Sequence, residues 1–380
     1  MLEATAGNSK SPIMETIHGA ESYVLKNDRV KVAVTAVGGH LAPVIFKLGE
    51  REVSPYALAP WLPDEVDQDL PVLLKNLRGD FLCLPFGPQE NGQPHGETAN
   101  FEWTLLEQTD DTLLLHIDPS DIDACVKKSI TLKPGHTALY LDHRIKGLEG
   151  DFNYGNHPIL DLSQLAEGQG RVTVSPFRWA SVYPPYFSDP ADGASQALER
   201  NAKFSDLREV PLAAGGTTDL THYPARSGND DLVMMVSQQT SKEQPFAWSA
   251  VVLDGYVWFQ IKNPADFPAT LFWLSNGGRS AAPWNSRHVG RLGVEEVCSH
   301  FCDSVDISRK DLLAAESIPT SRRFVKDERV SLRIIQAVAE VPENFGAVAK
   351  IVPAGDGHVT LIGETGIKVT EPLDWKFVVG

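Results

Sequence analysis

The sequence predicts an all-β protein of antiparallel strands, and three observations support this prediction. Short runs enriched in β-branched and aromatic residues recur along the 380 residues, and most are bounded by Gly, Pro, Asn or Asp. Turn sequences at 133–136 and 253–256 join neighbouring runs, and the second contains an Asp-Gly pair that accepts positive φ. Helical periodicity is scarce, so a sheet wound with alternating helices is disfavoured.

The predicted strands follow one another at short intervals. They lie at residues 23–25, 30–36, 101–107, 112–117, 126–132, 138–146, 172–174, 232–238, 248–253 and 257–262. Further runs at 331–339, 347–352, 358–362 and 367–370 predict strands in the C-terminal tail. The best helical candidate is short, at 309–317. Consecutive strands joined by tight turns predict an antiparallel meander.

Domain boundaries rest on the strand pattern, because no internal repeat or low-complexity linker is evident. We expect a main β domain at 1–324. Residues 325–380 supply C-terminal strands, either to a small appended unit or to the same sandwich. The stretch 184–216, rich in Pro, Asp, Ala and Gly, predicts a long surface loop, and loops of this length are usually functional.

Composition and charge exclude several classes of partner. The formal net charge is −16, and no basic run with interleaved aromatics occurs, so we expect neither nucleic acid nor an anionic membrane as a partner. No apolar stretch is long enough to span a membrane, and residues 1–12 are polar, unlike a signal peptide. Four cysteines are too few for a disulfide framework. We therefore expect a soluble, cytoplasmic protein.

Two histidines and a pair of carboxylates lie in contexts that suggest acid/base chemistry. His95 lies in a Pro-His-Gly-Glu turn, His157 precedes Pro158, and Glu295 and Glu296 follow a Gly-Val pair. A carboxylate and an imidazole suffice to interconvert sugar anomers, since a base takes the proton of the C1 hydroxyl while an acid protonates the ring oxygen. No electrons move in this reaction, so we expect no cofactor and no metal.

A longer series of motifs surrounds these residues. The stretch 77–88 (LRGDFLCLPFGP) is followed by His95-Gly96 and Trp103, and Asn156-His157-Pro158 and the segment 290–295 (GRLGVE) lie further along the chain. In order and spacing this series resembles the galactose mutarotase-like superfamily, which includes aldose 1-epimerases and glucose-6-phosphate 1-epimerases. The resemblance extends over 30–301. It implies a β-supersandwich of twisted antiparallel sheets with a sugar cleft on one concave face.

The resemblance also implies roles for individual residues. His157 would be the general acid at the ring oxygen, and Glu295 would be the general base at the C1 hydroxyl. His95 would hydrogen-bond the ring or a neighbouring hydroxyl. Arg78 matches a family arginine that lines the same cleft, where its guanidinium could bind a hydroxyl pair, a carboxylate or a phosphate.

Further residues are candidates for binding the sugar. Trp284 and Asn285 lie just before the proposed base and could offer a stacking face and a hydrogen bond. The family usually has an aspartate that binds sugar hydroxyls, and Asp219 and Asp254 are both candidates, although Asp254 fits a hairpin turn better. Ile159 occupies a position where the family usually has an aromatic residue. These departures leave the sugar itself open.

Structural explanations compete with the functional ones. A histidine before Gly or Pro is often a turn residue, and Arg78 could pair with Asp80 in a turn. Alternation along a strand would place only one of Glu295 and Glu296 in the cleft, and the family register selects Glu295.

Two other clusters also have competing explanations. The thiols and imidazole of Cys298, His300 and Cys302 could bind zinc, but alternation along a strand would place all three on one face, and packing is the favoured explanation. The aromatic residues at 179, 183, 186 and 187 could stack on a sugar or pack in the core.

We expect an isomerase that interconverts the anomers of an aldose, with a small carbohydrate as its partner. One alternative is a non-catalytic sugar-binding or sensing protein, for which Glu295 would be unnecessary. A second is a sugar-phosphate 1-epimerase that uses Arg78, together with Arg287 and Arg291. A two-carboxylate glycosidase is a weaker alternative. The sequence does not distinguish a monomer from a homodimer.

Overall fold

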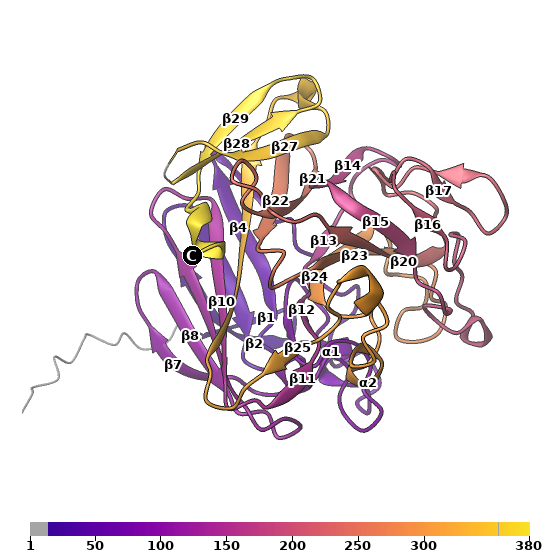
Figure 1. The fold of residues 1–380 in the computed structure, drawn as a ribbon. Helices are drawn as coiled ribbons and strands as arrows, with labels where there is room; N and C mark the ends of the chain where they lie inside the picture. The colour runs from indigo at the N-terminus through magenta and orange to yellow at the C-terminus, as the bar shows by residue number, and fades with distance from the viewer. Residues whose placement is uncertain (1–13, 356) are drawn as a thin grey trace, which may run out of the picture.

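The computed structural model describes residues 14–355 and 357–380, and these fold into two large antiparallel sheets with smaller sheets around them (Figure 1). The polar segment 1–12 lies outside the described residues. The all-β prediction is confirmed, since the only α-helices in the described part are two single turns, α1 (Val72–Lys75) and α2 (Val305–Ser308). Within the same part of the chain, no helix has the length and apolar character needed to span a membrane.

One large sheet has nine strands and forms one side of the molecule. In spatial order its strands are β19 (His222–Tyr223), β14 (Gly170–Val174), β21 (Ala247–Val252), β22 (Tyr256–Lys262), β26 (Val330–Glu340), β10 (Ala138–Lys146), β9 (Cys125–Leu132), β8 (Thr112–Ile117) and β7 (Thr104–Gln108). The hairpins β9–β10 and β21–β22 are joined by the two turns expected from the sequence.

The other large sheet has eight strands and carries the pocket described below. Its strands are β16 (Lys203–Phe204), β15 (Phe177–Val182), β20 (Asn229–Ser237), β23 (Ala269–Asn276), β24 (Arg291–Cys298), β12 (Tyr154–Asn156) and β6 (Leu82–Cys83) in spatial order, with β13 (Ile159–Asp161) also paired to β24. Most of these strands were not predicted. Several have only two or three residues, too few for a period to be read from the sequence.

Four smaller sheets complete the fold. The first has five strands, β1 (Met14–Ile17), β2 (Ala20–Lys26), β3 (Val30–Thr35), β4 (Leu41–Leu48) and β5 (Arg51–Val53). Two are pairs, β11 (Gly150–Phe152) with β25 (Arg322–Phe324) and β17 (Val210–Pro211) with β18 (Thr217–Thr218). The last has three strands, β27 (Val348–Pro353), β28 (His358–Gly363) and β29 (Lys368–Pro372). Figure 1 places β27–β29 at one end of the molecule. The tail is tied to the rest of the fold, because β26 lies between β22 and β10 in the nine-stranded sheet.

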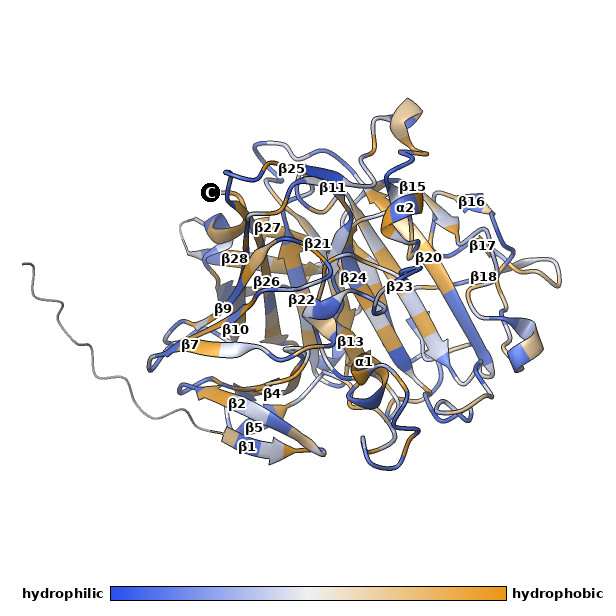
Figure 2. Ribbon diagram, turned by 90° about the horizontal axis from the view of Figure 1, so that it is seen from below, coloured by the Kyte–Doolittle hydropathy of each residue, from blue (hydrophilic) through white to orange (hydrophobic). Residues whose placement is uncertain are grey.

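Alternation along the strands of the eight-stranded sheet builds two apolar layers. In β20, Val233 and Met235 belong to the core between the two large sheets, whereas Leu232, Met234 and Val236 belong to a second cluster on the opposite face. Figure 2 shows apolar and polar positions along the strands of this sheet. The second cluster supplies the floor of the pocket, so the same strands stabilise the fold and shape the site.

The predicted helix at 309–317 is wrong. The segment contains only a 3-10 turn at Ala314–Glu316, following the single turn of α2. Asp311 and Ser317 have φ angles of 51° and 57°, which are incompatible with a right-handed helix. Leu312 is 55% exposed, so the segment also lacks a continuous apolar face to pack.

Candidate active site

A pocket of about 330 Å³ opens on the face of the eight-stranded sheet that is turned away from the central core. Strands β20, β23 and β24 form its floor, and loops on either side form its walls. Its lining residues are Leu73, Leu74, Leu77, Phe81, Pro88, Pro94, His95, His157, Tyr183, Tyr186, Phe187, Leu232, Trp273, Arg279, Trp284, Glu295 and Cys302. The walls are largely apolar, with a few polar groups converging on the interior, as is typical of small-molecule sites.

His157 and Glu295 meet in this pocket. Nε2 of His157 lies 3.4 Å from Oε1 of Glu295, and both side chains are at least nine-tenths buried. Glu295 comes from the middle of β24, opposite Leu271 of β23, and His157 follows directly after β12. Since β12 and β24 are neighbours in the sheet, the fold brings together two residues that are 138 positions apart in the sequence.

Aromatic packing fixes the imidazole of His157. Its ring stacks on Phe81, with ring centroids 4.6 Å apart, and meets the edge of Trp273 at 5.9 Å. The backbone N–H of His157 donates to the carbonyl of Phe81 at 3.0 Å. The ring therefore cannot turn away from Glu295 without repacking its neighbours.

His95 completes the group from a loop that follows β6. Its ring lies 5.3 Å from that of His157, centroid to centroid. The N–H of Gly87 donates to Nδ1 of His95 at 3.3 Å, so the neutral ring carries its proton on Nε2. The next residue, Gly96, has a φ of 75°, and a Cβ there would lie 2.1 Å from the carbonyl oxygen of Leu84. The Pro-His-Gly turn thus requires its glycine.

Burial shifts the pKa values of all three groups so that their neutral forms are favoured. It raises the pKa of Glu295 to about 8, and the nearby Arg279 opposes this rise. It lowers the pKa of His157 well below 6.5, an effect to which His95 adds. The pKa of His95 falls to about 4, also through burial. At neutral pH the His157–Glu295 pair therefore holds one proton, which resides mainly on the carboxyl group.

The alternation expected along β24 separates Glu295 from Glu296. Glu296 is buried between the large sheets, where Ser249, Gln260 and Thr270 donate hydrogen bonds to it at 2.7–2.9 Å. The ammonium group of Lys262 forms an ion pair with the same carboxylate. Glu296 thus lies in a satisfied interior network and does not reach the pocket.

Arg279 is a pocket residue that sequence reasoning missed. It follows β23 in a Gly-Gly-Arg stretch, and its guanidinium lies over the rings of Trp284, Phe187 and Trp273 at 4.6, 4.7 and 5.2 Å from their centroids. Its Nε lies 3.4 Å from Oδ2 of Asp230. A single arginine after a short apolar run carries no motif in the sequence, so only the folded sheet identifies it.

The aromatic residues considered for the long loop divide between the two expected roles. Tyr183, Tyr186 and Phe187 line the pocket. The Tyr183 hydroxyl donates to Asp303 at 2.5 Å, which orients its ring. Trp179 lies outside the lining, where the ammonium of Lys203 is 4.7 Å from its ring centroid.

Of the predicted binding residues, Trp284 lines the pocket and three others do not. Arg78 is buried and donates to the backbone carbonyls of Ile17, His18 and Asn76 at 2.8–2.9 Å, so its donors hold the β1–β2 turn.

The other two predicted binding residues lie in turns. The amide of Asn285 is directed to the carbonyl of Pro283 at 3.5 Å. Asp219 accepts hydrogen bonds from Thr221 and His222 in a partly exposed turn. Neither side chain belongs to the pocket lining.

The remaining arginines of the expected phosphate set also lie elsewhere. Arg291 forms an ion pair with Asp161. Arg287 donates to the carbonyl of Pro283 at 3.2 Å and stands over Trp61. Neither belongs to the pocket lining, so the structure does not gather Arg78, Arg287 and Arg291 into an anion pocket.

The expected common face for Cys298, His300 and Cys302 is wrong, because β24 ends at Cys298. His300 pairs with Asp303 at 2.7 Å, and Cys302 turns toward the pocket. Cys298 is buried in the central core. The three side chains therefore do not converge on a single point.

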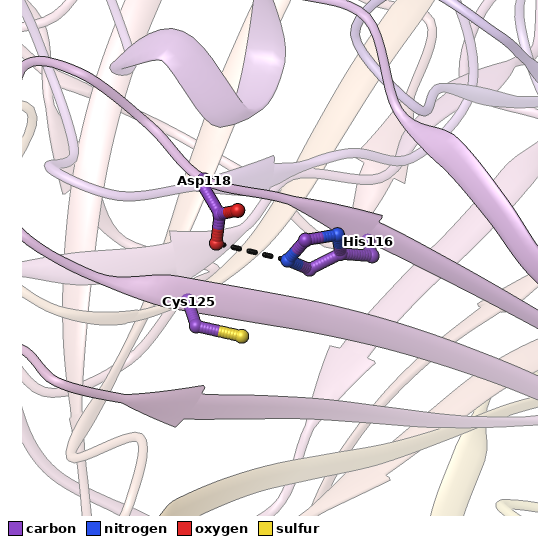
Figure 3. A group of neighbouring side chains, drawn as sticks. All are labelled: His116, Asp118 and Cys125. Atoms are coloured by element: carbon purple, nitrogen blue, oxygen red, sulfur yellow. Dashed lines mark hydrogen bonds and ion pairs between the residues drawn. The ribbon is translucent and has the colours of Figure 1, made fainter.

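Another group of potential metal ligands lies at the end of β8 and the start of β9 (Figure 3). One ligand atom each from His116, Asp118 and Cys125 lies within 4.8 Å of the others, and these are ligand types that zinc accepts. Nε2 of His116 pairs with Oδ1 of Asp118 at 2.9 Å, and the aspartate is 66% exposed. None of the three lines the pocket, so this cluster is separate from the acid/base pair.

Comparison with known proteins identifies the fold. No protein-family model and no curated protein sequence matches the chain. Among solved structures it is similar to a galactose mutarotase related enzyme from Lactobacillus acidophilus, at 13% identity and a TM-score of 0.57, over 85% of this chain and 98% of that one.

Two further structures agree. A candidate aldose 1-epimerase from Escherichia coli K12 gives 13% identity and a TM-score of 0.55, over 84% of this chain and 99% of that one. A candidate aldose 1-epimerase from Klebsiella pneumoniae gives 13% identity and a TM-score of 0.58, over 86% of this chain and 83% of that one. The predicted β-supersandwich is confirmed, and the chain has the galactose mutarotase-like fold.

Proposed function

We propose that the protein interconverts the anomers of an aldose, with Glu295 as general base and His157 as general acid. The observation that carries this proposal is the 3.4 Å separation of the two groups inside a pocket wide enough for a sugar ring. The names of the similar structures support the same reaction class, since they are described as mutarotase-related or as candidate aldose 1-epimerases.

The proton count of the pair suits this reaction. Ring opening removes one proton from the C1 hydroxyl and delivers one to the ring oxygen, so the catalyst must take and give a proton in the same step. A Glu295–His157 pair that shares one proton can do both once that proton moves from the carboxyl group to the imidazole. Ring closure on the other face reverses the transfers and restores the pair.

His95 assists through its Nε2 proton in this mechanism. Because Nδ1 accepts from Gly87, Nε2 is left to donate toward the pocket, and burial keeps the ring neutral. A neutral donor beside His157 can hold the ring oxygen or an adjacent hydroxyl without repelling the imidazolium that forms transiently there.

The burial of Glu295 favours catalysis over binding alone. A carboxyl group that is 2% exposed, with a pKa near 8 and the buried imidazole of His157 at 3.4 Å, is costly to keep in a cleft. A protein that only bound sugars would gain more from a neutral amide at this position. Strongly shifted carboxyl groups in pockets are characteristic of catalytic acids and bases.

The experiment is saturation-transfer NMR of anomer exchange over a panel of free and phosphorylated hexoses, with the wild type, Glu295→Gln and His157→Asn. We expect the wild type to accelerate exchange and each variant to lose at least about 100-fold of that acceleration. Sugar binding without any acceleration by the wild type would contradict the proposal and assign the protein to the sensing class.

A further inference from the structure

Arg279 carries a positive charge into the pocket through an aromatic cage. Rings of Trp284, Phe187 and Trp273 surround its guanidinium at 4.6–5.2 Å. The side chain is 19% exposed and lines the same cavity as Glu295. Aromatic faces hold a cation in place but offer its N–H groups no hydrogen-bond acceptor in the plane of the guanidinium.

The donors of Arg279 are largely unused by the protein. A guanidinium has five N–H donors, and among residues 14–355 and 357–380 none of those on Arg279 forms a hydrogen bond with a protein acceptor. Arg78, which is 1% exposed, uses its donors on three backbone carbonyls. This contrast indicates that Arg279 is held for a ligand and not for the fold.

The nearby carboxylate of Asp230 does not cancel this charge. Its Oδ1 accepts from the backbone N–H groups of Gly278 and Asn276, and its Oδ2 accepts from Ser275 and Trp273. Four donors therefore share its negative charge, and its contact with Arg279 is an ion pair at 3.4 Å. Asp230 positions the guanidinium but leaves its outward donors free for an anion.

The number of cations in the pocket limits the kind of anion. Among the described lining residues, Arg279 is the only arginine or lysine. A carboxylate bears one negative charge and matches the planar fork of one guanidinium. A phosphate monoester bears about 1.5 to 2 negative charges at neutral pH and would bring excess charge beside Glu295.

We propose that the sugar bound here carries a carboxylate, as in a hexuronate, and that Arg279 binds that carboxylate. This inference rests on the proposed anomer exchange and specifies its substrate class. Glu295 and His157 then act on the anomeric centre and ring oxygen. Arg279 selects for the carboxylate of the sugar, and the aromatic cage shields the guanidinium from solvent.

The experiment measures kcat/KM for anomer exchange with glucuronate, galacturonate, glucose, galactose and glucose 6-phosphate. We expect the wild type to prefer a uronate over its neutral hexose, and Arg279→Gln to lower that preference about 10- to 100-fold, as expected for the loss of a charged hydrogen bond. Arg279→Lys should keep part of it. Arg287→Gln serves as the matched control and should leave the preference unchanged.

Two outcomes would overturn the inference. One is a wild-type preference for glucose 6-phosphate or a neutral hexose over both uronates. The other is an equal loss for every sugar in Arg279→Gln together with a shifted pH profile, which would mean that Arg279 acts only on the charge of Glu295.

Line broadening of the sugar resonances separates this inference from the proposed function. Uronate binding that depends on Arg279, without accelerated exchange of any sugar, would uphold the carboxylate site and refute the epimerase proposal. Fast exchange with no preference for sugars that carry a carboxylate would uphold the epimerase proposal and refute the carboxylate site. If Arg279→Gln does not fold, Arg279→Lys tests the same point, because it keeps the charge but loses the planar fork and should lower the uronate preference in part.

Discussion

The carboxylates of Glu295 and Glu296 are adjacent in sequence yet face opposite sides of β24. Glu295 opens into the pocket, 3.4 Å from the imidazole of His157. Glu296 lies between the sheets, paired with Lys262 and bonded to three further donors. One strand therefore turns one carboxylate into the pocket and buries the other in the core, and substitutions at the two positions should have different effects.

Glu296→Gln should destabilise the fold. The change leaves the ammonium of Lys262, which is 1% exposed, without its counter-charge in the protein interior. Removing one partner of a buried ion pair typically costs about 3–5 kcal/mol. Urea denaturation should give this loss in the free energy of unfolding, and a loss below about 1 kcal/mol would contradict the importance of the pair.

Glu295→Gln should become more stable relative to the wild type as pH rises. The pKa of Glu295 is about 8 in the folded chain and near 4.5 when unfolded, so the folded state binds more protons between these values. The wild type therefore loses stability from this group as pH rises from 4.5 to 8, by at most about 1.4 kcal/mol per pH unit. Glutamine does not titrate. Thermal melts of both proteins at pH 5 and pH 8 measure the difference, and a constant difference would refute the shifted pKa.

The pH profile of anomer exchange should have its alkaline limb near pH 8. The active pair holds one proton, which is lost as pH passes the raised pKa of Glu295, and it gains a second only below the depressed pKa of His157. If glutamate and histidine had their ordinary pKa values, the shared proton would be lost, and activity would end, above about pH 6.5. Measuring kcat/KM from pH 4 to pH 10 distinguishes shifted from ordinary pKa values. An alkaline limb at pH 6.5 would contradict the raised pKa of Glu295.

Arg78→Gln should weaken the fold and leave KM for the sugar unchanged. The guanidinium donates to three backbone carbonyls and does not line the pocket. Hydrogen bonds from charged donors contribute about 1.5–3 kcal/mol each, so the free energy of unfolding should fall by at least about 2 kcal/mol. Chemical denaturation and steady-state kinetics check the two halves of this prediction. A raised KM at unchanged stability would return Arg78 to the binding site.

Much of the nine-stranded sheet could be predicted from the sequence, because most of its strands are runs of five or more residues bounded by turn sequences. The strands at Thr112–Ile117 and Ala138–Lys146 were predicted to the residue. The eight-stranded sheet was predicted poorly. Strand β23 is buried at every position, so it has no alternation between exposed and buried residues. Strands β6 and β12 have only two and three residues, too few for an alternating pattern to be recognised.

The candidate site divides along similar lines. His95, His157 and Glu295 stand in short motifs, and the fold brings all three into one pocket. Arg279 could not be found, because its placement depends on three aromatic rings from separate segments. The motif around Arg78 was informative about the fold, yet its side chain serves the backbone. A sequence motif indicates a shared fold, but the packing of the folded chain determines which of its side chains face a ligand.

The central claim is that Glu295 and His157 act as one acid/base unit, and a double-variant cycle tests it most directly. Anomer exchange is measured for Glu295→Gln, His157→Asn and the double variant, with sugar binding verified in each by line broadening. Residues that act as a unit are strongly non-additive, so each single variant should lose nearly as much rate as the double variant. Losses that multiply in the double variant, or a single variant that keeps most of its activity, would contradict the account.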